Sequence, residues 1–405
     1  MKSLRLTAAM AFTAMIATAP AFAADDTITI GMTQSETGSL NVDSVAQYRG
    51  FEMWRDEVNA AGGIAAGGKH YKVKFVSYDD QSQGGRVQQL YTRLIVQDKA
   101  EFLFAPYSSG LTATAAVISE QYGKIMIITG GAEEKTYELG NKYLFQVITP
   151  AGHYLSGALE ALHSKDPHAK LAFVYSDDPF SKAVVSAARD QAKEAGFDVV
   201  LDESYAPSTT DFGPVVNKMI SAKADALFGG GHYPDSATLA RQVYDQKANL
   251  KWESLLVAPG DEKFATLGPA ALGVSTGSQW EQPVAYKPQF GPTGAEFAKR
   301  FKAKYHIDAD YHSASGYAGG AILQHAIEQA GSVAPAKVAA ALNKTDVTTF
   351  FGHVKFATDP GHHGMQIAHA MVVAQWVMEN GKLSRQVVWP RDAASAPLLF
   401  PIPAH

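Results

Sequence analysis

The sequence predicts an α/β protein made of two lobes, each a doubly wound parallel sheet covered by helices on both faces. From Thr27 onward, short β-rich runs alternate with helical stretches, and the connections between them are short. The segments 99-KAEFLFAPYSSG-110 and 223-KADALFGGGHYP-234 share the pattern Lys-Ala-acid-x-Leu-Phe at an offset of 124 residues. This repeat indicates that the two lobes are copies of one plan. The chain length of 405 residues also fits two domains of roughly 150 residues or more.

The expected strands are nearly continuous apolar runs, which are typical of parallel strands buried on both faces. In chain order they are 27–32, 72–78, 102–104, 125–128, 170–175, 198–203, 226–228, 255–257 and 273–276. The helices expected between them include 44–60, 87–97, 112–122, 182–195 and 236–246. A second weak match, between 61-AGG-63 with its following strand and 195-AGFDVVLDESYA-206, occurs in the same order as the first and supports the repeat.

The first 23 residues are predicted to be a secretory signal peptide. Lys2 and Arg5 precede an uncharged run, and the small-x-small triplet Ala21-Phe22-Ala23 follows it. We therefore expect an exported, soluble protein. Removal of the two basic residues changes the formal net charge from −5 to −7, which argues against a nucleic-acid partner. The chain has no cysteine, so a disulfide framework and a cysteine-based metal site are both excluded.

Two loops in corresponding places suggest a binding cleft. Residues 107–110 and 229–233 each follow a predicted strand and precede a predicted helix. Ligands of open parallel sheets bind beyond the carboxyl ends of the strands, so facing lobes would bring these loops to opposite walls of one cleft. Ser108 and Ser109 have three interpretations: a nucleophile, a helix cap, or a binding site for an anionic or polar ligand group. The nucleophile elbow Gly-x-Ser-x-Gly is absent, which leaves the helix cap and the ligand-binding site, and we favour ligand binding.

Neither a metal site nor a phosphate cradle is expected. The sequence has 13 histidines but no His-Glu-x-x-His motif, and 360-PGHHG-364 is typical of a polar turn. The glycine-rich 229-GGGHYPD-235 lacks a P-loop and a dinucleotide fingerprint. Aromatic and imidazole side chains follow several strands, as is typical of a small-molecule cleft: Tyr107, Phe180, Tyr205, His232, Tyr233 and Trp280. We expect no cofactor.

Several segments, in order and spacing, resemble the periplasmic leucine/isoleucine/valine-type solute-binding proteins of ABC importers. They include 27-TITIGMTQSETGSL-40, 59-NAAGGI-64, 77-SYDDQS-82, 105-APYSSGLT-112, 209-TTDFGPVV-216, 230-GGHYPDSATLARQ-242, 326-AIEQAGS-332, 351-FGHVKF-356 and 386-QVVWP-390. The resemblance implies a type I binding-protein fold with two lobes joined by a three-crossover hinge. It places lobe one at 25–148 plus 278–364 and lobe two at 149–277 plus 365–405. It also implies a non-catalytic monomer that closes around a small molecule and docks on a membrane permease.

Ligand contacts are carried over from the resemblance position by position. The implied contacts are Ser39, Ser108, Ser109, Gly131, Ala132, Glu133, Phe180, His232, Asp261 and Trp280. Glu133 stands where the family tends to offer a hydroxyl, and its charge would repel an anion unless it is protonated or turned away. The family's acidic partner for a ligand ammonium aligns with Gly260, with Asp261 beside it, which disfavours an α-amino acid.

The segment 277-GSQWEQP-283 resembles family members that take aromatic acids, and Trp280 is expected to stack on a ring. We therefore favour an aromatic or other hydrophobic carboxylate over leucine. A branched-chain amino acid or short amide, a periplasmic sensor subunit and a secreted serine hydrolase remain the alternatives.

Overall fold

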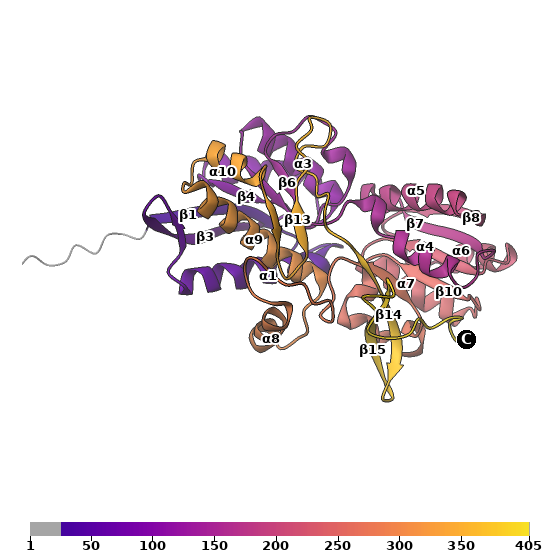
Figure 1. Cartoon of the computed structure of the whole chain (residues 1–405). Helices are drawn as coiled ribbons and strands as arrows, with labels where there is room; N and C mark the ends of the chain where they lie inside the picture. The colour runs from indigo at the N-terminus through magenta and orange to yellow at the C-terminus, as the bar shows by residue number, and fades with distance from the viewer. Residues whose placement is uncertain (1–25, 405) are drawn as a thin grey trace, which may run out of the picture.

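The computed structural model describes residues 26–404, which form two α/β lobes lying side by side (Figure 1). The predicted signal peptide, residues 1–23, lies outside the described residues. Each lobe is built on its own central sheet, one of six strands and one of seven. A separate antiparallel pair, β12 (Asp346–Thr348) and β13 (His353–Lys355), lies in the later part of the chain.

The sheet of lobe one has the strand order β2-β3-β1-β4-β5-β6. The five strands from β3 to β6 are parallel, and β2 is antiparallel to β3. The strands are β1 (Asp26–Gln34), β2 (Ile64–Ala66), β3 (Lys69–Asp79), β4 (Phe102–Phe104), β5 (Met126–Ile128) and β6 (Leu144–Gln146). Strand β4 is fully buried, as the run of three apolar residues predicts.

Both faces of this sheet are covered by helices, so successive residues of a strand contribute to different cores. Phe102 and Phe104 join the core with α1, whereas Leu103 between them joins the core with α2 and α3. The helices of lobe one are α1 (Asn41–Ala60), α2 (Gly84–Val96), α3 (Ser109–Gln121), α8 (Gly294–Tyr305), α9 (Tyr311–Ala330) and α10 (Pro335–Leu342), with the 3-10 turn η1 (Glu134–Thr136).

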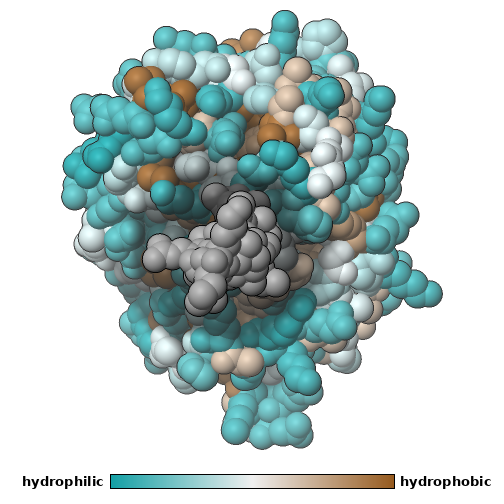
Figure 2. Space-filling model, turned by 90° about the vertical axis from the view of Figure 1, so that its left-hand side faces the viewer, coloured by the Kyte–Doolittle hydropathy of each residue, from teal (hydrophilic) through white to brown (hydrophobic). Residues whose placement is uncertain are grey.

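Helices α1 and α9 pack very closely although they are far apart in sequence. A Cβ atom on Gly50 would lie 2.0 Å from the Ser313 carbonyl oxygen, and one on Gly316 would lie 2.2 Å from the Gln47 carbonyl oxygen. Only glycine allows the two backbones to approach in this way. The end of lobe one that faces away from lobe two shows mainly hydrophilic residues, with hydrophobic residues in small separate groups (Figure 2). The visible part of this face therefore lacks the broad apolar patch that permanent protein contacts use.

The sheet of lobe two has the order β15-β14-β11-β10-β9-β7-β8. Its strands are β7 (Lys170–Ser176), β8 (Asp198–Tyr205), β9 (Ala226–Gly230), β10 (Trp252–Leu255), β11 (Ser275–Ser278), β14 (Val372–Glu379) and β15 (Lys382–Trp389). Its helices are α4 (Ser156–His163), α5 (Pro179–Glu194), α6 (Gly213–Ser221) and α7 (Tyr233–Asp245), with the 3-10 segments η2 (Ala151–His153), η3 (Ala258–Gly260) and η4 (Glu262–Ala271). The antiparallel hairpin β14–β15 extends the parallel part of this sheet at the β11 edge.

The two lobes repeat one arrangement. The order β3-β1-β4-β5-β6 in lobe one matches β8-β7-β9-β10-β11 in lobe two. Lys99 and Lys223, which begin the repeated segments, both have positive φ, at 58° and 56°. Ser108 and His232, again 124 residues apart, are the N-cap residues of α3 and α7. The prediction of two doubly wound lobes is confirmed.

Three connections cross between the lobes: residues 147–150, 279–293 and 356–371. Most predicted strands lie within two or three residues of the observed bounds. The strand predicted at 255–257 is an exception, because β10 ends at Leu255. Val257 has φ 61° and starts a 3-10 turn, so the apolar run at 255–257 leaves the sheet rather than continuing it.

Candidate functional site

A cavity of about 290 Å³ lies between the lobes, beyond the carboxyl ends of both sheets. The lobe-one wall consists of Ser39, Leu40, Ser82, Gly84, Ser108, Gly110 and Leu111. The lobe-two wall consists of Ser176, Asp178, Pro179, Pro207, His232, Pro234 and Asp235. The volume suits a small molecule, since it falls near the lower end of ordinary ligand sites. Ser39, Ser108 and His232 are thus brought together from both lobes.

The N-terminal ends of five helices contribute to this lining. They belong to α1, α2 and α3 in lobe one and to α5 and α7 in lobe two. Each helix end carries partial positive charge and unpaired backbone N–H groups, and therefore favours an anionic group of a ligand. Within the described range 26–404, no lysine or arginine lines the cavity, so helix ends and hydroxyls are the anion-binding features there.

Helix α3 starts at the serine pair. The Ser108 Oγ accepts a hydrogen bond from the Leu111 N–H at 3.3 Å, and Ser108 has φ 84°. The Thr112 N–H bonds to the Ser108 carbonyl oxygen. No acceptor within residues 26–404 is assigned to the N–H groups of Ser109 and Gly110. The two N–H groups at the start of α3 are therefore available to a ligand.

Ser109 is bound to the loop that follows β5. Its Oγ accepts hydrogen bonds from the N–H groups of Ala132 and Glu133, both at 3.1 Å. The Gly131 carbonyl accepts from the Gln146 side chain at 3.1 Å. Ser109 and the three loop residues are not part of the cavity lining, so the structure places the 131–133 loop behind Ser109. Glu133 is half-buried, and burial raises the pKa of its carboxyl above the usual value.

Aromatic and imidazole rings fill the interior beside the cavity. The Tyr107 hydroxyl lies 3.2 Å from Nδ1 of His232, which is a direct contact between the lobes. The His232 ring also packs on Phe180, with centroids 5.8 Å apart, and Tyr107 packs edge-on against His312 at 5.1 Å. Phe180, at the start of α5, therefore supports His232 in the lobe-two wall.

Carboxyl groups from both lobes gather next to these rings. Asp43 comes from α1, Asp310 is the N-cap of α9, and Asp261 is the N-cap of η4 in lobe two. Burial, followed by the charge of Asp261, raises the pKa of Asp43 well above its usual value. Burial and the charge of Asp310 raise the pKa of Asp261. His312 is kept neutral because burial lowers its pKa to about 3.

The structure places Trp280 in the core rather than along the cavity. Its ring meets Phe297 and Phe350 edge-on, with centroids 5.5 and 6.0 Å apart, and only 2% of its surface is exposed. Asp261 is also not a lining residue, and its Oδ1 accepts from the Lys263 N–H at 2.7 Å.

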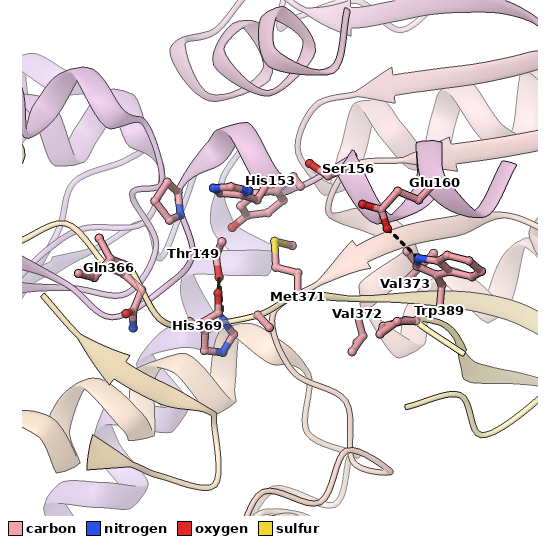
Figure 3. Close-up of a pocket in the computed structure, with 16 residues that line it drawn as sticks. Thr149, His153, Ser156, Glu160, Gln366, His369, Met371, Val372, Val373 and Trp389 are labelled. Atoms are coloured by element: carbon pink, nitrogen blue, oxygen red, sulfur yellow. Dashed lines mark hydrogen bonds between the residues drawn. The ribbon is translucent and has the colours of Figure 1, made fainter. Parts of the chain in front are cut away.

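A second cavity, of about 320 Å³, lies at the hinge between the first and third connections (Figure 3). Thr149 forms the junction there. The Thr149 N–H donates to the Gln279 Oε1 at 2.9 Å, and the Gln279 Nε2 donates back to the Thr149 carbonyl. The Thr149 hydroxyl lies 2.7 Å from Nδ1 of His369. Burial lowers the pKa of His369 to about 4, and its Nε2 contacts the Phe351 carbonyl at 2.9 Å. One residue thus links all three connections.

The part of the chain that the structure describes contains no group of three or more histidine, aspartate or glutamate side chains arranged to hold a metal ion. His362 pairs with Asp359 within the turn at 359–362. Within residues 26–404, no helix is both long and apolar enough to cross a membrane.

Several residues of the cleft were not predicted from the sequence. Ser176, Asp178, Asp235 and Ser82 line it, and Asp43 and His312 lie close behind. Asp178 is the N-cap of α5, two residues after strand β7, and so occupies the same kind of position as Ser108 and His232. Asp235 lies in the first turn of α7, three residues after His232. The available signal is therefore the strand-to-helix loop together with the first turn of the helix, applied to every polar residue there rather than to serines and aromatics alone.

Residues 27–382 match the model of a periplasmic binding protein family, and the chain belongs to this family. It has the type I fold. An amino acid binding protein of Pseudomonas aeruginosa is 27% identical over 336 residues, which cover 80% of this chain and 84% of the relative. Among solved structures, LivJ of Streptococcus pneumoniae superposes with a TM-score of 0.76 at 23% identity. LivJ is a branched-chain amino acid substrate-binding protein, solved in complex with isoleucine, and the match covers 90% of this chain and 100% of LivJ.

A solute-binding protein of an ABC transporter from R. palustris, in complex with benzoate, superposes with a TM-score of 0.75 at 20% identity. The match covers 94% of this chain and 98% of that protein. The fold is therefore shared with binding proteins for both aliphatic amino acids and an aromatic acid.

Proposed function

We propose that this protein is the periplasmic ligand-capturing component of an ABC importer. It binds a small hydrophobic or aromatic carboxylate between its lobes, closes around it, and delivers it to a membrane permease. The observation that carries the proposal is the cavity between the lobes, whose lobe-one wall presents the start of α3 with unpaired N–H groups and the Ser108 hydroxyl. Such a helix start is suited to a carboxylate.

In the proposed binding mode, the ligand carboxylate accepts hydrogen bonds from the N–H groups of Ser109 and Gly110. The apolar part of the ligand lies against Leu40, Leu111 and the proline side chains of the opposite wall. Closure brings α5 over the start of α3, since a Cβ on Gly110 would lie 3.7 Å from the Pro179 ring. The charge of Glu133 is no obstacle to this mode, because the residue stands behind Ser109 and outside the lining.

A branched-chain amino acid is the second candidate ligand. The observation that favours it is the group of buried carboxyls, among them Asp43 and Asp261, that would attract an ammonium group. The relative from Pseudomonas aeruginosa, which is named as an amino acid binding protein, also supports it.

A thermal-shift screen of residues 24–405 with aromatic acids, branched-chain amino acids and short amides tests the proposal. A ligand of the native state stabilises it by about 2.7 kcal/mol at a hundredfold excess over the dissociation constant. We expect aromatic acids to raise the unfolding midpoint and isothermal titration to give one site per chain. A response to amino acids alone would replace the aromatic acid by the second candidate. Turnover of an ester substrate that is lost in Ser108→Ala, without any ligand response, would contradict the binding function itself.

A further inference from the structure

The two walls of the cavity between the lobes differ in charge. Among residues 26–404, the lobe-one wall has no charged side chain, whereas the lobe-two wall has two carboxyl groups, Asp178 and Asp235. His232 is the only basic side chain that this described part of the chain contributes to the lining, and its Nε2 is 3.8 Å from the Asp178 carboxylate. A ligand that offered only a carboxylate would therefore match one wall and leave the other without a partner.

Ser176 provides an independent sign that the lobe-two wall contacts a ligand. The residue ends strand β7, lines the cavity and is only 1% exposed. Its Oγ is buried and has no hydrogen-bond partner within residues 26–404. Buried hydroxyl groups nearly always have a partner, and leaving one unpaired is costly. A polar ligand group next to Ser176 would satisfy it.

The protein holds Asp235 and Asp178 in place by bonds that leave acceptor capacity unused. The Tyr205 hydroxyl donates to the Asp235 Oδ2 at 2.8 Å. Asp178 caps α5 by accepting from the N–H and the hydroxyl of Ser181, at 3.1 and 2.7 Å. An ionised carboxylate can accept about four hydrogen bonds, so each group can accept more from a ligand.

Gly231 keeps this wall compact. A Cβ atom at this position would lie 2.2 Å from the Asp235 Oδ2 and 2.7 Å from the Ser176 Cβ. The absence of a side chain thus lets Asp235 and Ser176 approach the same stretch of backbone. Their positions are set by packing before any ligand arrives, which is the arrangement that gives specificity in small-molecule sites.

We propose that Ser176, Asp178 and Asp235 form a recognition site for a hydrogen-bond-donating group at the end of the ligand remote from its carboxylate. This assignment rests on the proposed function and makes it more specific. The ligand is a hydrophobic or aromatic acid that carries an amino or hydroxyl group, with its carboxylate at α3 and its donor group at the lobe-two wall. An acid whose remote end is purely apolar would leave the two carboxylates and the Ser176 hydroxyl desolvated without compensation.

Matched aromatic acids test this site. The probes are 4-hydroxybenzoate, 4-aminobenzoate and 4-(aminomethyl)benzoate, compared with 4-methylbenzoate, which has similar shape but no donor. We expect at least one donor-bearing acid to bind about tenfold or more tightly than the methyl analogue, because hydrogen bonds to a charged acceptor have this strength. The hydroxyl, aniline and ammonium probes also separate a neutral donor from a cationic one.

The variants are Ser176→Ala and Asp235→Asn, with Ser221→Ala on the exposed end of α6 as the control. We expect the ratio of dissociation constants between the methyl analogue and the preferred donor to fall towards one in the first two and to persist in the control. Unfolding midpoints without ligand identify any variant that is merely unstable. Equal binding of donor and methyl acids, with ratios unchanged by the substitutions, would overturn this site alone. If no aromatic acid binds at all, the proposed ligand class fails and this site fails with it.

Discussion

The Tyr107 hydroxyl of lobe one and the Nδ1 atom of His232 in lobe two lie 3.2 Å apart, so the lobes are joined by a bond between their own side chains. Two further contacts cross the same gap. The Tyr233 N–H lies 3.5 Å from the Asp43 Oδ2, and the Asp308 N–H donates to the Glu262 Oε2 at 3.2 Å. The conformation is therefore a closed one, and contacts between residues of the two lobes stabilise it.

Removal of the Tyr107 hydroxyl is expected to weaken closure. Tyr107→Phe keeps the ring packing on His232 and His312 but loses the bond between lobes, which is worth about 0.5–1.5 kcal/mol. The dissociation constant for a bound acid should rise roughly twofold to tenfold, because the binding-competent state is less populated. Titration calorimetry measures the constant, and small-angle scattering reports the larger radius of the open form. Tyr122→Phe, at the exposed end of α3, is the matched control and should change neither quantity.

Ligand binding is expected to tighten as pH falls from 7 towards 5. Asp43 and Asp310 of lobe one and Asp261 of lobe two all have a raised pKa in the closed form, with burial as the largest cause. A carboxyl whose pKa is raised binds a proton more readily in the closed state. Its contribution to closure is therefore present at low pH and is lost as pH rises through the raised pKa.

Titration calorimetry in two buffers of different ionisation enthalpy should accordingly detect proton uptake on binding. Asp43→Asn should reduce both the uptake and the slope of affinity against pH, whereas Glu194→Gln, on the exposed surface of α5, should leave both unchanged. A binding constant that is flat between pH 5 and 7 would show that these carboxyls stay equally protonated in the open and closed forms.

A negative charge at the start of α3 is expected to abolish binding of a carboxylate. A side chain at Gly110 has room, since a Cβ atom there would have its nearest neighbour 3.7 Å away, and it would project across the cleft towards Pro179. Gly110→Asp places two like charges together, which costs several kcal/mol and should raise the dissociation constant by about a hundredfold or more. Gly110→Ala separates the charge from the added volume and should retain most of the affinity. Equal losses of affinity in both variants would indicate a purely steric effect. Unchanged affinity in both would mean that the ligand carboxylate binds elsewhere.

The hinge junction is expected to depend on the Thr149 hydroxyl. Thr149→Val keeps the shape of the side chain but leaves the buried Nδ1 of His369 without its donor. An unsatisfied buried acceptor costs about 1–3 kcal/mol, so the free energy of unfolding in urea should fall by that amount. Thr266→Val, at an exposed position of η4, should change it by less than about 0.5 kcal/mol. If the free energy of unfolding of Thr149→Val equals that of the native protein, Gln279 alone holds the junction.

Local sequence determines most of the fold. Strand β4 is predicted with its observed bounds because Phe102–Phe104 is an isolated apolar run. The repeat that begins at Lys99 and Lys223 predicts two lobes of the same plan, and the structure gives both lysines a positive φ. The prediction for strand β10 falls too late in the chain, because its Glu253 and Ser254 are buried despite being polar. That burial depends on neighbouring strands and is invisible in a local window.

The candidate site is predictable in part for a related reason. Ser39, Ser108 and His232 stand in loops after strands, and the structure places them in the lining. Whether an individual side chain faces the cavity depends on contacts made by distant segments. Ser109 bonds to the loop after β5, and Trp280 packs edge-on against Phe297 and Phe350, which come from later segments of the chain. The residues adjacent in sequence to Ser109 and Trp280 give no indication of either contact.

The close packing of α1 against α9 has a consequence for how the chain is made. Gly50 on α1 meets Ser313 on α9, yet all the parallel strands of lobe two are synthesised between these two helices. During translation, the apolar face of α1 that packs against α9 is therefore exposed until α9 has been synthesised. Lobe two is interrupted in turn, because the β14–β15 hairpin that extends its sheet is made after α9 and α10. Neither lobe can be completed before most of the chain has left the ribosome, and neither can be obtained as a single continuous fragment.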